Sequence, residues 1–156
     1  MLVVTSATAA ATSTTERAAL TDLAHATNLA RWIRRRNWLS NHSVCAWQLV
    51  GCDETGRVKT LSLDFTGLHG TLPTSIGALT HLEALDLEGN SLSGSVPSEL
   101  GQLTSLVQLG LGGTNAFEGA LPPSLCPVLD RIVNATSSPQ GESTLLVWMR
   151  QTTAIW

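Results

Sequence analysis

Charge is scarce in this chain of 156 residues, because Asp, Glu, Lys and Arg together make up 13% of it and the formal net charge is −3. One basic cluster stands out, the run Arg34-Arg35-Arg36. A protein that binds nucleic acid normally presents a basic face to the phosphates, so we do not expect nucleic acid as a partner. Long apolar runs are also missing, and none reaches the ~20 residues that a membrane-spanning helix requires. We therefore expect no membrane span in this chain.

Patterns that carry catalysis or hold metal ions are missing as well. The four histidines are scattered and show no zinc-binding spacing such as H-E-x-x-H. No G-x-S-x-G nucleophile motif occurs, and the glycine-rich residues 110–113 lack the Lys-Ser/Thr that follows in a phosphate-binding loop. We therefore predict that the protein is not an enzyme and has no metal site and no cofactor.

What the sequence does contain is a leucine pattern that occurs three times at an interval of 24 residues. In each copy two leucines flank a single residue, as in a short strand with one buried face. In the middle copy Asn90 follows the strand, where its amide can hydrogen-bond turn backbone, and Gly94 and Pro97 then favour a bend. The paired leucines are Leu61 and Leu63, Leu85 and Leu87, and Leu109 and Leu111.

One such unit is not stable alone. Ordering its residues costs ~1–2 kcal/mol each in backbone entropy, whereas its roughly eight apolar side chains return ~1.5–3 kcal/mol each when buried. Neighbouring units must therefore stack and share a core. The stretch LSGSVPSELGQL also resembles the plant-type leucine-rich repeat family. That resemblance implies an α/β solenoid: a short right-handed repeat array with a parallel concave sheet and a helical N-terminal cap.

The repeats divide the chain into four expected regions. Residues 1–13 are expected to be disordered, residues 14–57 to form the N-terminal cap, and residues 58–128 to form about three repeats. Residues 129–156 lack the leucine pattern and are expected to form an irregular tail that packs poorly from about residue 130, apart from a fold-back at 145–148. The array then ends near the minimum for stability, so we expect the sequence to be a fragment of a longer protein, with an end that comes from a faulty gene model as the alternative.

The expected cap begins with a helix over residues 15–27. Ser13-Thr14-Thr15-Glu16 fits a capping box, in which Ser13 caps the helix and Glu16 reaches back. Three tryptophans follow, and they favour a lid over the open end of the array, although a tryptophan cluster can also form a sugar-binding platform. They are Trp32, Trp38 and Trp47.

The stretch CAWQLVGCDETGRVKTLSL resembles the N-terminal cap of plant-type repeat proteins. The resemblance implies a disulfide between Cys45 and Cys52 and places Leu49 where the family has glycine. The third cysteine, Cys126, is expected to be a small buried apolar group, with intermolecular pairing or reactivity as the alternative.

A structural disulfide indicates an oxidising compartment. The sequons at Asn41 and Asn134 indicate the same and make both residues candidate glycosylation sites. The N-terminus, however, lacks the basic start and long apolar stretch of a signal peptide. We expect an extracellular or cell-surface protein, with intracellular residence as the alternative.

The outward positions of the strands are the expected ligand-binding surface. The family resemblance implies a non-catalytic module that recognises a protein or peptide, such as part of a receptor ectodomain. The alternative is a secreted inhibitor of an extracellular enzyme. The expected ligand-binding residues are Thr60, Ser62, Asp64, Phe65, Ala84, Asp86, Glu88 and Gln108.

Overall fold

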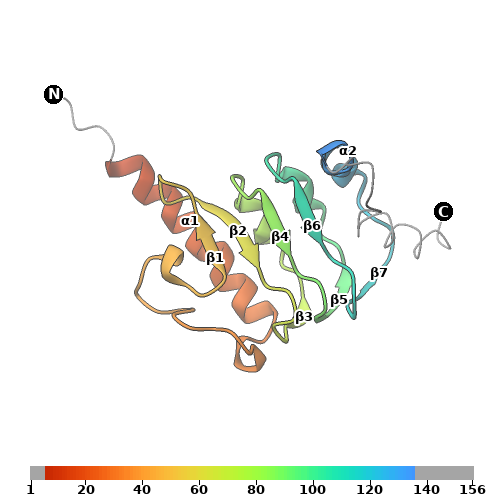
Figure 1. The fold of residues 1–156 in the computed structure, drawn as a ribbon, viewed down its shortest axis with the longest axis horizontal. Coiled ribbons are helices and arrows are strands. Elements are labelled where there is room, and N and C mark those ends of the chain that lie inside the picture. The colour runs from red at the N-terminus through yellow and green to blue at the C-terminus, as the bar shows by residue number, and fades with distance from the viewer. Residues whose placement is uncertain (1–5, 136–156) are drawn as a thin grey trace.

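The leucine pattern produces a row of short strands in the computed structural model, which describes the backbone of residues 6–135 and the side chains of residues 14–132. One sheet has the strand order β1-β2-β4-β6 (Figure 1). Within it β2, β4 and β6 are parallel, and Leu61, Leu85 and Leu109 stand in register. The predicted parallel strands are therefore confirmed. The bounds are β1 Val50–Cys52, β2 Val58–Ser62, β4 Ala84–Asp86 and β6 Gln108–Gly110.

The sheet is mixed rather than purely parallel, because β1 pairs antiparallel with β2. The residues that follow β2, β4 and β6 in the chain form a second, parallel sheet with the order β3-β5-β7. Sequence reasoning predicted neither β1 nor this second sheet. Its strands are β3 His69–Thr71, β5 Ser91–Ser95 and β7 Ala116–Glu118, and the short 3₁₀ helices after them are Thr74–Ala78, Ser98–Gln102 and Pro123–Leu125.

The core runs through the middle of the row, between the two sheets and the 3₁₀ helices. The paired leucines are almost completely buried, including Leu61, Leu85 and Leu87, which expose none of their surface. Asn90 lies among them and is also buried. Its Oδ1 accepts hydrogen bonds from the backbone N–H groups of residues 66–68, and its Nδ2 donates to the carbonyls of Leu63 and Leu87. One asparagine thus joins two consecutive repeats.

The helix α1, Ser6–Ala26, packs along the first repeat at one end of the row (Figure 1). It begins nine residues before the predicted start at residue 15, so Ser13 is inside the helix and is not its N-cap. Residues 6–13, expected to be disordered, are helical. Glu16 does not reach back to the helix start but forward to the first repeat, where it contacts Arg57. The alanine-rich sequence before Ser13 favours helix without any capping residue, which explains the earlier start.

The three tryptophans form a buried cluster beside α1 and do not form an exposed platform. The ring centroids of Trp32 and Trp38 are 4.6 Å apart, and those of Trp38 and Trp47 are 5.0 Å apart. The guanidinium of Arg17 on α1 lies 5.1 Å from the centroid of Trp47. Because each tryptophan exposes 6% of its surface or less, the sugar-platform alternative is wrong and the cluster is part of the core.

The Cys45–Cys52 disulfide is present, with a Cα–Cα distance of 5.6 Å. Between the two cysteines, Leu49 has a φ of 72°. This is the left-handed region that glycine enters without strain, which gives a physical reason for the glycine of related caps.

Replacing Leu49 with glycine should therefore change stability little, although the leucine packs against the core. Removing the left-handed strain gains ~1–2 kcal/mol, which offsets the partly buried side chain that is lost. We expect the free energy of unfolding to stay within about 1 kcal/mol of the parent in a denaturant titration. Leu49→Ala, which keeps the strain and loses the packing, is the control and should be less stable than Leu49→Gly. The reverse order would contradict the strain argument.

The helix α2, Cys126–Ala135, follows the last repeat and lies beyond β6 (Figure 1). Val128, Leu129 and Ile132 are buried against the end of the core. The guanidinium of Arg131 donates to the carbonyls of Thr104 and Leu106. The expectation that the chain is irregular from residue 129 and packs poorly from about residue 130 is therefore wrong for residues 129–135. The expected fold-back at residues 145–148 lies outside the described residues.

Candidate recognition face

The outer face of the first sheet brings the predicted ligand-binding residues together. Thr60, Ala84 and Gln108 stand in one row across β2, β4 and β6. Ser62, Asp86 and Gly110 form the next row. We call this surface, with the residues that follow each strand, the strand face.

The strand face continues past the ends of the strands. The N–H of Phe65 donates to the carbonyl of Glu88 at 2.9 Å, so neighbouring repeats stay paired there. Asp64, Asp86 and Glu88 are half-buried, whereas Phe65 exposes 65% of its surface. All eight predicted residues therefore lie on or beside one sheet, and their role in binding stays a prediction.

Glycines give this face its shape. A Cβ on Gly89 would clash with the ring of Phe65, and one on Gly110 would lie 2.5 Å from Oδ1 of Asp86. A Cβ on Gly113 would lie 3.2 Å from Cγ of Glu88. Each of these longer side chains thus leans over a glycine of the next repeat. Sequence reasoning missed this role, although the glycines at the end of β6 and after β4 and β6 were its signal.

Within residues 14–132, whose side chains the structure describes, the carboxylates of the strand face form no ion pair. Among the described residues the ion pairs are Arg57 with Glu16 and Lys59 with Glu83, and neither includes Asp64, Asp86 or Glu88. Oδ1 of Asp86 accepts the N–H of Glu88 at 3.1 Å. The face therefore presents negative charge to solvent.

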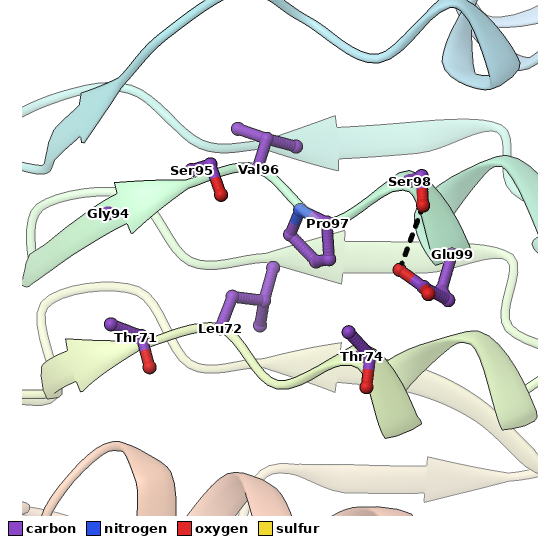
Figure 2. A pocket seen from close by; sticks show the side chains of 9 residues that line it. All are labelled: Thr71, Leu72, Thr74, Gly94, Ser95, Val96, Pro97, Ser98 and Glu99. Carbon is purple, nitrogen blue, oxygen red and sulfur yellow. Dashed lines mark hydrogen bonds between the residues drawn. The ribbon is translucent and has the colours of Figure 1, made fainter.

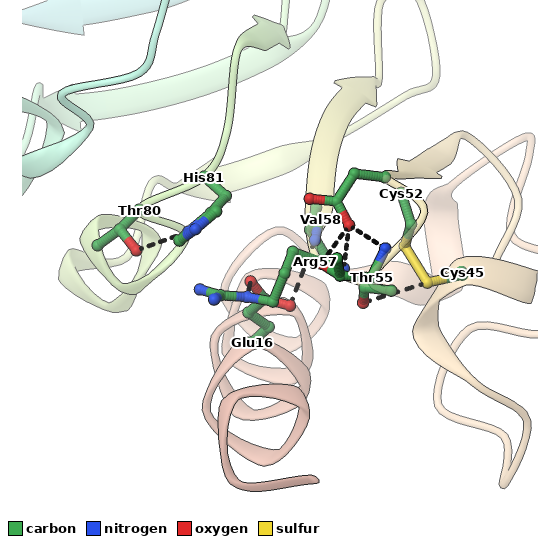
Figure 3. A network of polar contacts seen from close by, with 10 residues as sticks. Glu16, Cys45, Cys52, Thr55, Arg57, Val58, Thr80 and His81 are labelled. Atoms are coloured by element: carbon green, nitrogen blue, oxygen red, sulfur yellow. Dashed lines mark hydrogen bonds and ion pairs between the residues drawn. A yellow bond between two sulfur atoms is a disulfide. The ribbon is translucent and has the colours of Figure 1, made fainter. Parts of the chain in front are cut away.

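A separate polar network fastens α1 and the disulfide turn to the first repeat (Figure 3). Glu16, which is almost completely buried, accepts from Nε of Arg57 at 2.9 Å and from the N–H of Val58 at 3.3 Å. Asp53 accepts from the hydroxyl of Thr55 and then from the N–H of Arg57, and these bonds lower its pKa. The network explains how this turn is held and offers no ligand site.

A groove of about 540 Å³ lies on the other sheet, between the connections that follow β3 and β5 (Figure 2). Its hydroxyl groups come from Thr71, Thr74, Ser95 and Ser98, and the hydroxyl of Ser98 donates to Glu99 at 3.1 Å. Leu72, Val96 and Pro97 supply its apolar lining. No feature singled out in the sequence predicted this groove.

The remaining candidate residues are dispersed. Asn41 is exposed in the loop before the disulfide, whereas the side chain of Asn134 lies outside the described residues. Cys126 is exposed at the start of α2 and is not the buried apolar group that we expected, because the helix turns Val128, Leu129 and Ile132 towards the core instead. The described residues contain no cluster of three potential metal ligands. Among them, no helix is both long and apolar enough to span a membrane.

Comparison with known proteins agrees with the repeat geometry. Residues 56–116 match the family model described as leucine rich repeat. The chain is similar to the BIR2 ectodomain of Arabidopsis thaliana, with 30% identity over 70% of this chain and 60% of that one and a TM-score of 0.63. The three units share one leucine spacing, their strands pair in parallel, and the family model matches residues 56–116. Together these features define a repeat protein of the plant type. The chain is a plant-type leucine-rich repeat protein.

Two further solved structures bear on function. The ectodomain of the Arabidopsis thaliana receptor kinase GASSHO1/SCHENGEN3, solved with CASPARIAN STRIP INTEGRITY FACTOR 2, is 33% identical over 76% of this chain and 14% of that one, with a TM-score of 0.61. A plant ice-binding protein is 29% identical over 72% of this chain and 44% of that one, with a TM-score of 0.50. The chain thus spans less than two thirds of each of these structures.

Proposed function

We propose that this protein is a non-catalytic recognition module that binds a protein or peptide through the strand face. The observation that carries the proposal is the strand face itself, where an exposed aromatic ring lies beside three carboxylates that form no ion pair among the described residues. The similar GASSHO1/SCHENGEN3 ectodomain was solved with CASPARIAN STRIP INTEGRITY FACTOR 2, which supports a binding role. In this proposal residues 58–128 form a right-handed solenoid whose concave side is the strand face, and residues 14–57 are its cap.

The proposed location is extracellular or at the cell surface. The Cys45–Cys52 disulfide is typical of oxidising compartments. Asn41 lies exposed in its sequon and is the proposed glycosylation site within the described side chains. The similar BIR2 and GASSHO1/SCHENGEN3 structures are ectodomains, which supports the same location.

Reversing charge on the strand face should weaken partner binding and leave folding intact. Asp86→Lys/Glu88→Lys changes two half-buried residues that form no ion pair among the described residues, and surface changes usually alter stability by no more than ~0.5 kcal/mol each. For a basic partner captured from the extracellular fraction of the source organism and identified by mass spectrometry, we expect the association rate at low salt to fall about ten-fold or more. Surface plasmon resonance across a salt series measures this rate.

The matched control is Asp22→Lys/Glu54→Lys, which makes the same change in net charge at two exposed residues away from the strand face. It should retain most of the parent's association rate. Equal slowing by both variants would show that only net charge matters, and no slowing by either would place the partner elsewhere on the molecule.

Inhibition of an extracellular enzyme is the alternative use of the same face. The two uses are distinguished by the identity of the captured partner, which is an enzyme in the case of an inhibitor. If that partner is an enzyme, its activity should fall as the parent protein is added, and Asp86→Lys/Glu88→Lys should inhibit it less.

A second candidate function, ice binding, uses the second sheet. Thr71, Ser91, Ser93 and Ser95 are exposed on β3 and β5, and parallel strands hold their hydroxyls at a regular spacing of ~4.8 Å. The similarity to a plant ice-binding protein supports this candidate. Its test is ice-recrystallisation inhibition, which Ser93→Lys should abolish. A parent protein without this activity would exclude the candidate.

A further inference from the structure

Phe65 stands at a position where the other two repeats have glycine. The residues 24 and 48 positions later, Gly89 and Gly113, have φ values of 66° and 75°. Phe65 has a φ of 47° at the same place in the first repeat. A left-handed backbone costs a residue with a Cβ ~1–2 kcal/mol, and glycine avoids this cost. The repeat geometry therefore favours glycine at position 65.

The aromatic ring gains little from burial in return. Phe65 exposes 65% of its surface, although its ring lies against Gly89 of the next repeat. The ring is held on a fixed backbone, since the N–H of Phe65 donates to the carbonyl of Glu88. An exposed aromatic residue on a rigid sheet is typical of the anchors at protein interfaces. The side chain is thus available to a partner and contributes little to the core.

The acidic residues adjacent to Phe65 and Gly89 in the sequence determine which chemical group the ring suits. Asp64 precedes Phe65 in the chain, and Glu88 precedes the glycine on which the ring lies. Neither carboxylate takes part in an ion pair within the described residues. An aromatic ring attracts a cation, and carboxylates bind the same cation by charge-assisted hydrogen bonds. Arginine meets both requirements, because its planar guanidinium stacks on rings and donates to carboxylates in pairs.

Basic groups limit this subsite on one side. The N–H of Ile33 donates to the carbonyl of Thr66 at 2.8 Å, so Arg34 follows close behind the first repeat. Arg35 is turned back to the carbonyls of Leu29 and Ala30. The backbone next to Arg34 therefore adjoins residue 66, whereas the ring of Phe65 leans over Gly89 of the next repeat, and a cationic group is favoured on that side.

We propose that Phe65, with Asp64 and Glu88, forms a subsite for one arginine side chain of the bound protein or peptide. This inference rests on the proposed function, because it assigns part of the strand face to one group of the ligand. It also predicts that the partner carries an exposed arginine that inserts beside Phe65.

The experiment is a titration of the full chain with N-acetyl-arginine-methylamide, followed by two-dimensional amide NMR. We expect millimolar binding that shifts the amide signals of Phe65, Glu88 and Gly89. The citrulline analogue, which has the same shape without the charge, should shift them much less. Absent shifts, or equal shifts with citrulline, would overturn the subsite, and an equal response to the lysine analogue would overturn its assignment to arginine.

Phe65→Gly is the main variant, because it gives the first repeat the glycine of the other two and should fold at least as well as the parent. It should weaken arginine binding about three-fold, as expected for the loss of an exposed cation–π contact. Phe65→Leu keeps an apolar side chain and should lose the same contact. The control Ile33→Ala truncates another highly exposed apolar residue, 76% exposed, and should bind like the parent. Unchanged binding in Phe65→Gly would contradict the role of the ring.

The failure of this inference can be told apart from that of the proposed function. If partner binding depends on Asp86 and Glu88 but the arginine probe does not bind beside Phe65, the subsite alone is wrong. If the probe binds beside Phe65 but Asp86→Lys/Glu88→Lys leaves the partner's association rate unchanged, the proposed function is wrong and the cation site remains.

Discussion

Replacing Asn90 with alanine is expected to lower the free energy of unfolding by about 3–5 kcal/mol. The side chain is buried and satisfies the N–H groups of Thr66, Gly67 and Leu68, all from the preceding repeat. Each buried donor or acceptor left without a partner costs ~1–3 kcal/mol, reduced where water can enter. Denaturant unfolding with the disulfide intact measures the loss.

Asn115→Ala is the matched control for this prediction. Asn115 stands in the corresponding turn of the last repeat and is half-buried. Its Oδ1 accepts one N–H, that of Leu92, whereas Asn90 accepts three. We therefore expect a smaller loss of stability, about half as large. Equal losses in the two variants would show that the number of N–H groups left without a partner does not determine the effect.

The strands of the repeats could be predicted because their signal is local and repeated. Leu61, Leu85 and Leu109 recur at a fixed interval, and each pair of leucines alternates with one outward residue. The amide of Asn90 was also expected to bind turn backbone. Strand β5 has the mostly polar sequence SLSGS with a single buried leucine. The second sheet therefore left no comparable pattern in the sequence.

The shape of the candidate site could be predicted only in part, because it depends on contacts between repeats. The outward residues followed from the alternation within each strand. The side chains of Phe65, Asp86 and Glu88 lie over glycines of the next repeat. This arrangement depends on the register between strands. A single sequence does not reveal this register directly, although the 24-residue interval aligns Phe65 with Gly89.

The start of α1 was missed for a similar reason. Ser13 and Glu16 have the spacing of a capping box, which is a local pattern, but Glu16 is used by a residue 41 positions away in the sequence. A buried carboxylate needs a partner, and no local rule identifies Arg57 as that partner. Tertiary contact therefore overrode the capping signal.

This contact makes Glu16→Ala the second substitution with a large expected effect. Glu16 exposes 1% of its surface, and the side chain of Arg57 exposes 19%. Removing the carboxylate leaves the Arg57 guanidinium and the N–H of Val58 without their partner at the junction of α1 and β2. Breaking a buried ion pair in this way costs ~3–5 kcal/mol, so we expect a loss near the lower end, about 3 kcal/mol, because Arg57 retains some access to water.

The chain contains a matched control in its other described ion pair. Lys59 and Glu83 are 3.1 Å apart, and their side chains expose 42% and 43% of their surface. Exposed pairs contribute ~0–1 kcal/mol, so Glu83→Ala should lower the free energy of unfolding by less than about 1 kcal/mol. Thermal and denaturant unfolding of both variants give the comparison. If Glu16→Ala is as stable as Glu83→Ala, α1 is held to the first repeat by the packing of Leu20 and Leu23, and the buried ion pair contributes little to that junction.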